Sequence, residues 1–357
     1  MTSLKIGLIG CGFIGRFHSI AIRYLIKQRL IDARYMAVCD FEGERARSFA
    51  EITGAELVTS NPRELIESPD VDIVYICVPT AGHKDLVLQA AEQGKHIFCE
   101  KPLATNLADV EEMMAAVEAA GLKAGVGLIL RHSPILTVLK LLTEDATIGR
   151  LMTAVFRDDQ FFPIQGHYAS IWRKDRALSG SGTLLEHSIH DVDVLRWFGG
   201  HVATVTGSID NFAGHEGVED LATAHIEFIS GGCAELVSIW HNVLRRPSSR
   251  RLELFFENAL FHIENDFMGP IGYQKHDEEP IVLTEEDVTA RYLELIGLPE
   301  DRFSGALRYS LEDYFFLNNI ARGEDPIPDF RLALEAHRVV DAIYRSAHAA
   351  GETMTVG

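Results

Sequence analysis

The first third of the chain alternates between two hydrophobic patterns. Short apolar runs that have strand character occupy residues 4–10, 33–40, 56–59, 71–79, 96–102 and 123–130. Apolar residues spaced by three or four, typical of amphipathic helices, occupy 13–29, 42–53, 62–68, 83–94 and 106–121. Alternating strands and helices predict a doubly wound α/β domain, with a parallel sheet covered by helices on both faces.

Beyond residue 130 the pattern changes. Helical periodicity returns at 134–143, 181–198, 307–322 and 330–349, and strand-like runs with short turns lie between these segments. Gly231 and Gly232 separate two such runs as in a β-hairpin. The pattern predicts a second α/β domain with a large, mostly antiparallel open sheet. We therefore expect two domains, residues 1–130 and 131–357.

Composition narrows the choice of partners. The chain has 33 Lys and Arg residues against 52 Asp and Glu residues, a formal net charge of −19. This charge repels nucleic acids and anionic membrane surfaces, so neither is an expected partner. The N-terminus lacks the pattern of a signal peptide, and the apolar runs are too short to span a bilayer. These features indicate a cytoplasmic protein.

A glycine-rich segment, "GCGFIG", joins the first strand to the first helix. Gly10 permits a tight turn, Gly12 lets the backbone approach a pyrophosphate, and Gly15 lets helix and strand pack closely. The helix N-terminus at Phe13 and Ile14 offers backbone N–H groups to the phosphates. In this context the motif predicts a Rossmann dinucleotide-binding domain.

Further cofactor-binding residues are expected at the ends of strands. Asp40 ends the second strand, where a carboxylate accepts hydrogen bonds from ribose hydroxyls and repels a 2′-phosphate, so NAD is favoured over NADP. Ligands of open α/β sheets bind beyond the carboxyl ends of strands, where "VPTAGH" and "CEKP" lie. The candidates in these two segments are Pro79, Thr80, His83, Glu100 and Lys101.

The segment 179–193, "SGSGTLLEHSIHDVD", concentrates ionisable side chains. On a continuous helix Glu186, His190 and Asp193 share one arc, His187 lies at its edge, and Asp191 points away as a solvated or capping group. A metal site, a solvated helix face and an acid–base site are all conceivable. The segment lacks H-E-x-x-H and a thiolate cluster, so we expect no metal. An acid–base site needs a lysine and a hydride acceptor, and the first domain supplies both.

Substrate contacts are expected just before this segment, in "DDQFFPIQGHYASIWRKD" at 158–175. Aromatic rings there can stack on a ligand and polar groups can hydrogen-bond it, although the same residues would also suit a packed surface loop. Arg131 and Arg173 offer bidentate partners for an acidic group. The substrate-binding candidates are His167, Tyr168, Trp172 and Arg173.

The order of the motifs resembles that of a known family. "GCGFIG", Asp40, "VPTAGH", "GKHIFCEKP", "VGLILRHSP", "IGR" and "SGSGTLLEHSIHDVD" are similar to the corresponding motifs of the glucose–fructose oxidoreductase, inositol dehydrogenase and MocA family. The resemblance implies a Rossmann domain followed by an α/β domain whose open sheet often mediates oligomerisation. A homodimer or homotetramer is therefore expected. Most members oxidise or reduce a carbon of a sugar or cyclitol.

The resemblance also implies residue roles. Lys101 matches the lysine that contacts the cofactor and the reacting oxygen, and Glu100 matches a glutamate near the nicotinamide ribose. His190 and Asp193 match the later motif. This chain departs from that motif at Ser181, where the family has glycine, and at Glu186, where it has aspartate.

The expected function is NAD-dependent hydride transfer at a secondary hydroxyl of a sugar, sugar derivative or cyclitol. Lys101 and His190 are the expected catalytic pair, and either one can be the proton acceptor. Glu186 and Asp193 are expected to bind substrate or orient the imidazole. Two alternatives remain open: cleavage of a glycosidic bond through transient sugar oxidation, and non-catalytic NAD-dependent regulation.

Overall fold

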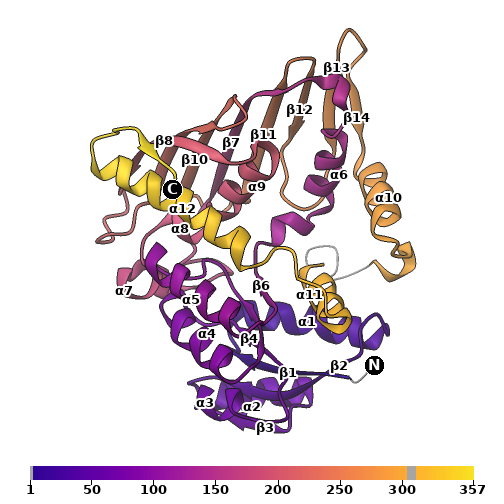
Figure 1. Ribbon diagram of the computed structural model, residues 1–357, viewed down its shortest axis with the longest axis vertical. Helices are drawn as coiled ribbons and strands as arrows, with labels where there is room; N and C mark the ends of the chain where they lie inside the picture. The colour runs from indigo at the N-terminus through magenta and orange to yellow at the C-terminus, as the bar shows by residue number, and fades with distance from the viewer. Residues whose placement is uncertain (1–2, 304–310) are drawn as a thin grey trace. The chain divides into compact units, whose positions relative to one another are not determined.

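A computed structural model describes residues 3–303 and 311–357, which form two compact units (Figure 1). Of the described residues, the first unit contains 3–128 and 311–334. The second contains 129–303 and Glu335–Gly357. The prediction assigned every residue after 130 to the second domain, whereas 311–334 cluster with the first unit.

A parallel six-stranded sheet, in the order β3-β2-β1-β4-β5-β6, forms the centre of the first unit. The predicted parallel sheet is confirmed. Its strand order reverses direction between β1 and β4, which creates the switch point where such sheets bind ligands. The strands are β1 (Leu4–Ile9), β2 (Ala33–Cys39), β3 (Leu57–Thr59), β4 (Ile73–Ile76), β5 (His96–Cys99) and β6 (Ala124–Val126).

Helices cover both faces of this sheet. Ile73 and Tyr75 of β4 pack in one core with Ile22, Phe49 and Phe316, which come from α1 (Phe13–Lys27), α2 (Gly43–Thr53) and α11 (Glu312–Arg322). The opposite core is formed with α3 (Pro62–Ile66), α4 (His83–Glu92) and α5 (Leu107–Ala119). In Figure 1, α11 lies beside α1. Burial on both faces explains why these strands are uninterrupted apolar runs.

The second unit contains a nine-stranded sheet in the order β14-β13-β12-β11-β7-β10-β9-β8-β15. Strands β7 and β10 pair in parallel and the other neighbours are antiparallel, so the predicted, mostly antiparallel sheet is confirmed, as is the hairpin at Gly231 and Gly232. The strands are β7 (Leu151–Phe161), β8 (Val202–Asp210), β9 (Leu221–Phe228), β10 (Cys233–His241), β11 (Ser249–Phe256), β12 (Ala259–Ile263), β13 (Ile271–Lys275), β14 (Ile281–Leu283) and β15 (Met354–Thr355).

Helices pack on one face of the second sheet. Helices α8 (Thr183–Glu186) and α9 (Ile189–Gly199) contact β10, and the missing side chain of Gly207 makes room for Ile343 of α12 (Phe330–His348). The remaining helices are α6 (Pro134–Leu142), α7 (Arg176–Ser179) and α10 (Glu285–Ile296). Among the described residues, every helix is too short or too polar to cross a lipid bilayer.

The predicted helix at 181–198 is wrong in one respect, because α8 ends at Glu186 and α9 begins at Ile189. At the break the Ser188 N–H donates to the Thr183 carbonyl, five residues back, over 2.9 Å. The hydroxyls of Thr183 and Ser188 both bond the Ser238 hydroxyl on β10, at 2.8 and 2.5 Å. These contacts with the sheet interrupt the helical ladder, a local distortion common at functional sites.

A buried cluster of charges holds α9 on the sheet. Arg250 Nε on β11 lies 2.9 Å from Asp191 Oδ1, and its Nη2 lies 3.1 Å from Asp158 Oδ2 on β7. The same Asp158 oxygen lies 2.7 Å from His187 Nε2. Asp191 is 0% exposed, so the expectation that it is a solvated or capping group is wrong. Burial and the neighbouring charge of Asp158 raise the pKa of Asp191 to about 7.

The turn between β1 and α1 requires its outer two glycines for steric reasons. Gly10 has a φ of +100°, and a Cβ there would stand 2.4 Å from the Cys77 carbonyl oxygen. A Cβ on Gly15 would stand 2.1 Å from the Gly10 oxygen. A Cβ on Gly12, by contrast, would meet nothing within 4 Å. The open position is the one that the motif reserves for the cofactor's phosphates.

Gly15→Ala and Gly12→Ala form a matched pair that tests this packing. We expect Gly15→Ala to lower the free energy of unfolding by about 1–3 kcal/mol, because the helix must move away from the strand. Gly12→Ala is expected to cost less than about 1 kcal/mol. Chemical denaturation of both variants measures the difference. Equal stability of the two would contradict the close approach at Gly15.

Asp191→Asn tests whether the buried Asp191 carboxyl takes up a proton on folding. Between the ordinary pKa of 3.8 and about 7, folded protein holds a proton at Asp191 that the unfolded chain releases. The free energy of unfolding therefore falls as pH rises through this window. The asparagine variant lacks this proton exchange, so its stability should decline less.

Urea unfolding at several pH values between about 5 and about 7 measures the two slopes. Titrating groups outside the Arg250 cluster are common to both proteins and cancel in the comparison. The carboxyl of Asp158 is the exception, because its pKa depends on Asp191, so its response forms part of the measured difference. The exposed Asp277→Asn substitution is the control and should keep the wild-type slope. Parallel pH dependences of wild type and Asp191→Asn would show that Asp191 does not exchange a proton in this range.

Candidate functional site

The N-terminus of α1 has the properties of a phosphate-binding site. Gly12 is its N-cap and has no capping side chain, and the first turn contains no acidic residue. Backbone N–H groups and the positive end of the helix dipole therefore meet no competing carboxylate from this turn. The open space at Gly12 fits the pyrophosphate of a dinucleotide, as the motif predicts.

Asp40 supports the glycine-rich loop. Its Oδ2 accepts a hydrogen bond from the Cys11 N–H over 2.9 Å, and its Oδ1 accepts one from the Glu42 N–H over 2.9 Å. Arg45 Nη1 lies 3.4 Å from the same carboxylate. Each Asp40 oxygen therefore has a backbone N–H and Arg45 Nη1 as donors, so a ribose hydroxyl that binds Asp40 must replace the long contact to Arg45.

The segment after β4 is anchored by His83. Its Nδ1 lies 2.9 Å from the Pro102 carbonyl oxygen and its Nε2 lies 2.9 Å from that of Val78. Both ring nitrogens thus face backbone oxygens, which assigns the imidazole to joining the loops after β4 and β5 rather than to contacting a cofactor. Pro79 precedes a short 3₁₀ turn, Thr80–Gly82, in which Thr80 is buried.

Glu100 and Lys101 follow β5. The Glu100 carboxylate accepts the Lys101 backbone N–H at Oε2 over 3.0 Å, and its Oε1 lies 2.9 Å from Nε2 of the buried His18. Burial alone raises the pKa of Glu100, but the bond to His18 and the charges of His18 and Lys101 outweigh it and lower the pKa. Glu100 is therefore an anion next to Lys101.

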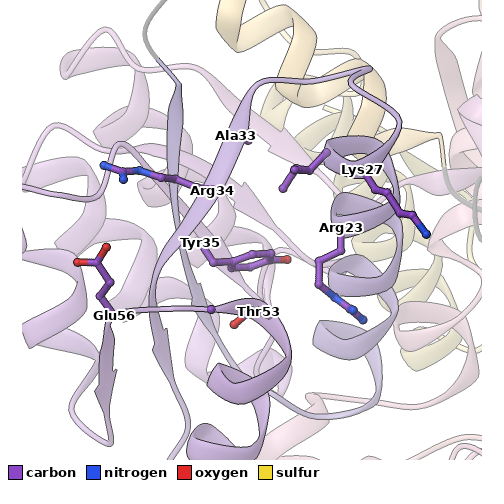
Figure 2. Close-up of a pocket in the computed structure, with 9 residues that line it drawn as sticks. Arg23, Lys27, Ala33, Arg34, Tyr35, Thr53 and Glu56 are labelled. Carbon is purple, nitrogen blue, oxygen red and sulfur yellow. The ribbon is translucent and has the colours of Figure 1, made fainter.

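A surface hollow of about 300 Å³ lies elsewhere in this unit (Figure 2). It is next to the start of β2, whereas Asp40 follows the end of that strand. Figure 2 shows Arg23 and Lys27 on α1, with Arg34 extending away from both. These cations do not converge on one point, so the hollow is not a candidate anion site.

In the second unit, two carboxylates of the segment 179–193 pair with arginines. Arg131 binds Asp193 bidentately, with Nε–Oδ2 and Nη2–Oδ1 distances of 2.7 and 2.8 Å. Arg173 Nε lies 3.1 Å from Glu186 Oε2. Both arginines thus bind acids of the chain itself, whereas we expected them to be available to an acidic ligand. His190, on α9, is 7% exposed.

The expected substrate-binding residues fall into two groups. Trp172 stacks under the Arg173 guanidinium at 4.7 Å, so Trp172, Arg173 and Glu186 lie together. His167 and Tyr168 instead cluster on Phe161, with ring centroids 5.5 and 5.6 Å from it. Their contact with substrate stays a prediction, as does that of Glu186 and Asp193.

Ser181 has a local explanation. Its hydroxyl donates to the Tyr344 hydroxyl over 2.8 Å, and Tyr344 in turn donates to Glu219 over 2.8 Å. Neighbouring Gly182 has no such freedom, because a Cβ there would stand 1.8 Å from the Glu219 carbonyl oxygen. The glycine-to-serine departure therefore falls at a position where a hydroxyl finds a partner.

The partners of Glu100 and Asp193 lie outside the motifs that contain these two acids. His18, which contacts Glu100, lies one helical turn after Gly15 on α1, and its second partner, Asp313, is 295 residues away. A histidine within an otherwise apolar helix face was the available signal. Arg131 was considered only as a ligand-binding residue, because nothing local links it to Asp193.

Comparison with known proteins covers both units. A family model described as "Oxidoreductase family, NAD-binding Rossmann fold" matches residues 4–128. A second, described as "GFO/IDH/MocA C-terminal domain", matches residues 136–262. Myo-inositol 2-dehydrogenase of Thermotoga maritima is 30% identical over 332 residues, which are 90% of this chain and 90% of that protein.

Two further relatives support the same assignment. Levoglucosan dehydrogenase of Pseudarthrobacter phenanthrenivorans is 30% identical over 216 residues, 59% of this chain and 55% of that protein. The crystal structure of an oxidoreductase domain protein from Kribbella flavida superimposes with a TM-score of 0.88 at 25% identity over 100% of both chains.

A solved structure of levoglucosan dehydrogenase in complex with NADH and L-sorbose also has a TM-score of 0.88, at 23% identity over 100% of both chains, and shows the shared fold. Taken with the two matching family models, these likenesses extend over both units. The chain therefore belongs to the glucose–fructose oxidoreductase, inositol dehydrogenase and MocA family and is an NAD-binding oxidoreductase.

Proposed function

We propose that this protein oxidises a secondary hydroxyl of a sugar, sugar derivative or cyclitol with NAD⁺. The observation that carries the proposal is the 30% identity to a myo-inositol 2-dehydrogenase across 90% of both chains. The arrangement at Glu100 and Lys101 supports it, because it presents a cation at the carboxyl end of the parallel sheet.

Lys101 and His190 are the proposed catalytic pair. Lys101 stabilises the developing alkoxide by charge and hydrogen bonding. His190 takes the hydroxyl proton, since imidazole titrates near neutral pH. When bound, NAD⁺ supplies the hydride acceptor. The Gly12 loop and Asp40 hold the pyrophosphate and the adenosine ribose.

The second unit supplies the proposed substrate contacts. Glu186 is fixed by Arg173 and its side chain is 0% exposed, so its carboxylate accepts a sugar hydroxyl only when Arg173 moves aside. Asp193 is fixed by Arg131, whose guanidinium also lies over the Trp197 ring at 5.2 Å. These pairs hold the acids in place without requiring a ligand.

Self-association into a homodimer or homotetramer forms part of the proposal. The side chains of Val155, Val237, Ile239 and Phe255 alternate with the buried residues of β7, β10 and β11. They therefore project from the face of the sheet opposite the helices, as partly exposed apolar groups. A second copy of this sheet would remove these groups from water.

Substitution of the catalytic pair tests the proposed reaction. We expect Lys101→Ala and His190→Ala each to lower kcat by about 10²-fold or more with inositols, anhydrosugars and aldoses, because each removes charge or proton transfer in the transition state. Lys27→Ala and His201→Ala, both at exposed positions, are the controls. Formation of NADH by absorbance is the measurement.

The alternatives give different readouts. Release of the aglycone from aryl glycosides without NADH accumulation would show that the protein cleaves glycosidic bonds without net oxidation and is not a dehydrogenase. Tight NAD⁺ binding with no turnover of any polyol or glycoside would indicate a regulator. Wild-type rates in both alanine variants would show that Lys101 and His190 are not catalytic residues.

Asp40→Ser tests the preference for NAD. The substitution removes the carboxylate that repels a 2′-phosphate and releases Arg45 to bind one. The ratio of the NADPH to NADH dissociation constants should fall about 10-fold or more. Titration of cofactor fluorescence measures both constants without a substrate. Asp40→Ser/Arg45→Ala should lose this gain, and an unchanged ratio in Asp40→Ser would refute the role of Asp40.

A further inference from the structure

We propose that His18 is a positioning residue that holds the Glu100 carboxylate and, through it, the backbone and charge environment of Lys101. His18 lies on α1 and does not itself reach a reacting atom. The inference rests on the proposed function, because that function assigns Lys101 to the reaction. It concerns contacts within the first unit only.

The geometry requires His18 to donate from both ring nitrogens. Its Nε2 lies 2.9 Å from Glu100 Oε1 and its Nδ1 lies 3.0 Å from Asp313 Oδ1. A carboxylate accepts hydrogen bonds, so the imidazole carries two N–H groups and a positive charge. Burial lowers the pKa of His18, but Asp313 and Glu100 outweigh burial and raise it well above its ordinary value.

Glu100 is constrained on three sides. Besides His18, it accepts the Lys101 N–H at Oε2 over 3.0 Å. On the third side is Gly127, where a Cβ would stand 2.8 Å from Oε2. The carboxylate fits because position 127 has no side chain. It cannot rotate without losing a bond to His18 or to the Lys101 backbone.

The surroundings make these contacts strong. The rings of Phe98 and Tyr75 lie 5.0 and 5.7 Å from the His18 ring and exclude water, which strengthens the attraction between charges. Glu312 adds a second carboxylate from α11, 4.0 Å from His18 Nδ1. Glu312 and Asp313 lie in the first turn of α11, where the helix dipole stabilises negative charge.

A metal ion explains this cluster less well. Ligand atoms of His18, Glu100 and Glu312 all lie within 4.8 Å of one another, close enough to share an ion. A metal-bound histidine must present a lone pair, whereas both nitrogens of His18 face carboxylates as donors. The imidazolium already supplies the positive charge that a metal would bring.

Two substitutions of His18 separate its two contacts. Glutamine places an amide donor near the position of Nε2 and can still bind Glu100. Asparagine is shorter and reaches only toward Asp313. Both remove the positive charge, so a difference between them reports which contact is kept, the one to Glu100 or the one to Asp313, rather than the charge.

The first readout needs neither cofactor nor substrate. Lys101 is partly exposed, so reductive methylation with ¹³C-formaldehyde labels it, and Lys101→Arg identifies its NMR signal. We expect His18→Asn to shift this signal and its titration midpoint, and His18→Gln to return both toward wild type. Gly127→Ala should also shift them, because the new methyl displaces the carboxylate without removing charge.

The second readout is kinetic. We expect His18→Asn to lower kcat by about 10- to 100-fold while the KM for polyol changes little, because a misplaced Lys101 impairs the chemical step. His18→Gln should lose less. His96→Gln, at the other end of β5, is the control and should leave the Lys101 signal unchanged.

Each outcome decides the inference. An unshifted Lys101 signal in folded His18→Asn and Gly127→Ala would overturn it. If His18→Asn does not fold, Gly127→Ala decides alone: a shifted Lys101 signal supports the inference and an unshifted one overturns it, while His18→Gln should stay near wild type. A shifted signal in a protein that oxidises no polyol would uphold the positioning role and reject the dehydrogenase. Polyol oxidation with an unshifted signal would uphold the dehydrogenase and reject the positioning role of His18.

Discussion

The close contact between helix α1 and strand β1 at Gly15 is the constraint on which the first unit depends. A single methyl group at this position would stand 2.1 Å from the Gly10 oxygen, so the helix lies on the strand only because glycine is there. That contact directs the helix N-terminus to the carboxyl edge of the sheet. One turn later the same helix brings His18 to Glu100 at the end of β5. One helix therefore shapes the phosphate loop and also supports the segment that carries Lys101.

The second unit depends on ion pairs, in which arginines of the same chain hold buried acids. Asp191 pairs with Arg250, Asp193 with Arg131 and Glu186 with Arg173. A carboxylate in a low-dielectric environment is costly unless it is paired, so each pair permits burial of an acid close to His190. In the sequence, the acids of segment 179–193 looked available to bind a ligand. In the structure, each of these three acids is paired with an arginine.

Prediction succeeded where the signal is local. The apolar strands, the glycine-rich turn and the Glu-Lys-Pro segment are each contiguous, and their order was sufficient to identify the family. It failed where the partner is distant in sequence. The helix around Glu186 is interrupted because Thr183 and Ser188 bond Ser238 on another strand, and no helical periodicity contains that information.

The sequence by itself therefore determined the two α/β units, the cofactor loop and the residue types available for chemistry, because these follow from periodicity and from the backbone demands of glycine. Only the tertiary structure decided which charges neutralise one another. Asp313 of α11 lies 295 residues from His18, and Arg131 lies 62 from Asp193. Ion pairs between distant segments depend on how the chain folds back on itself, and burial rather than sequence spacing determines their strength.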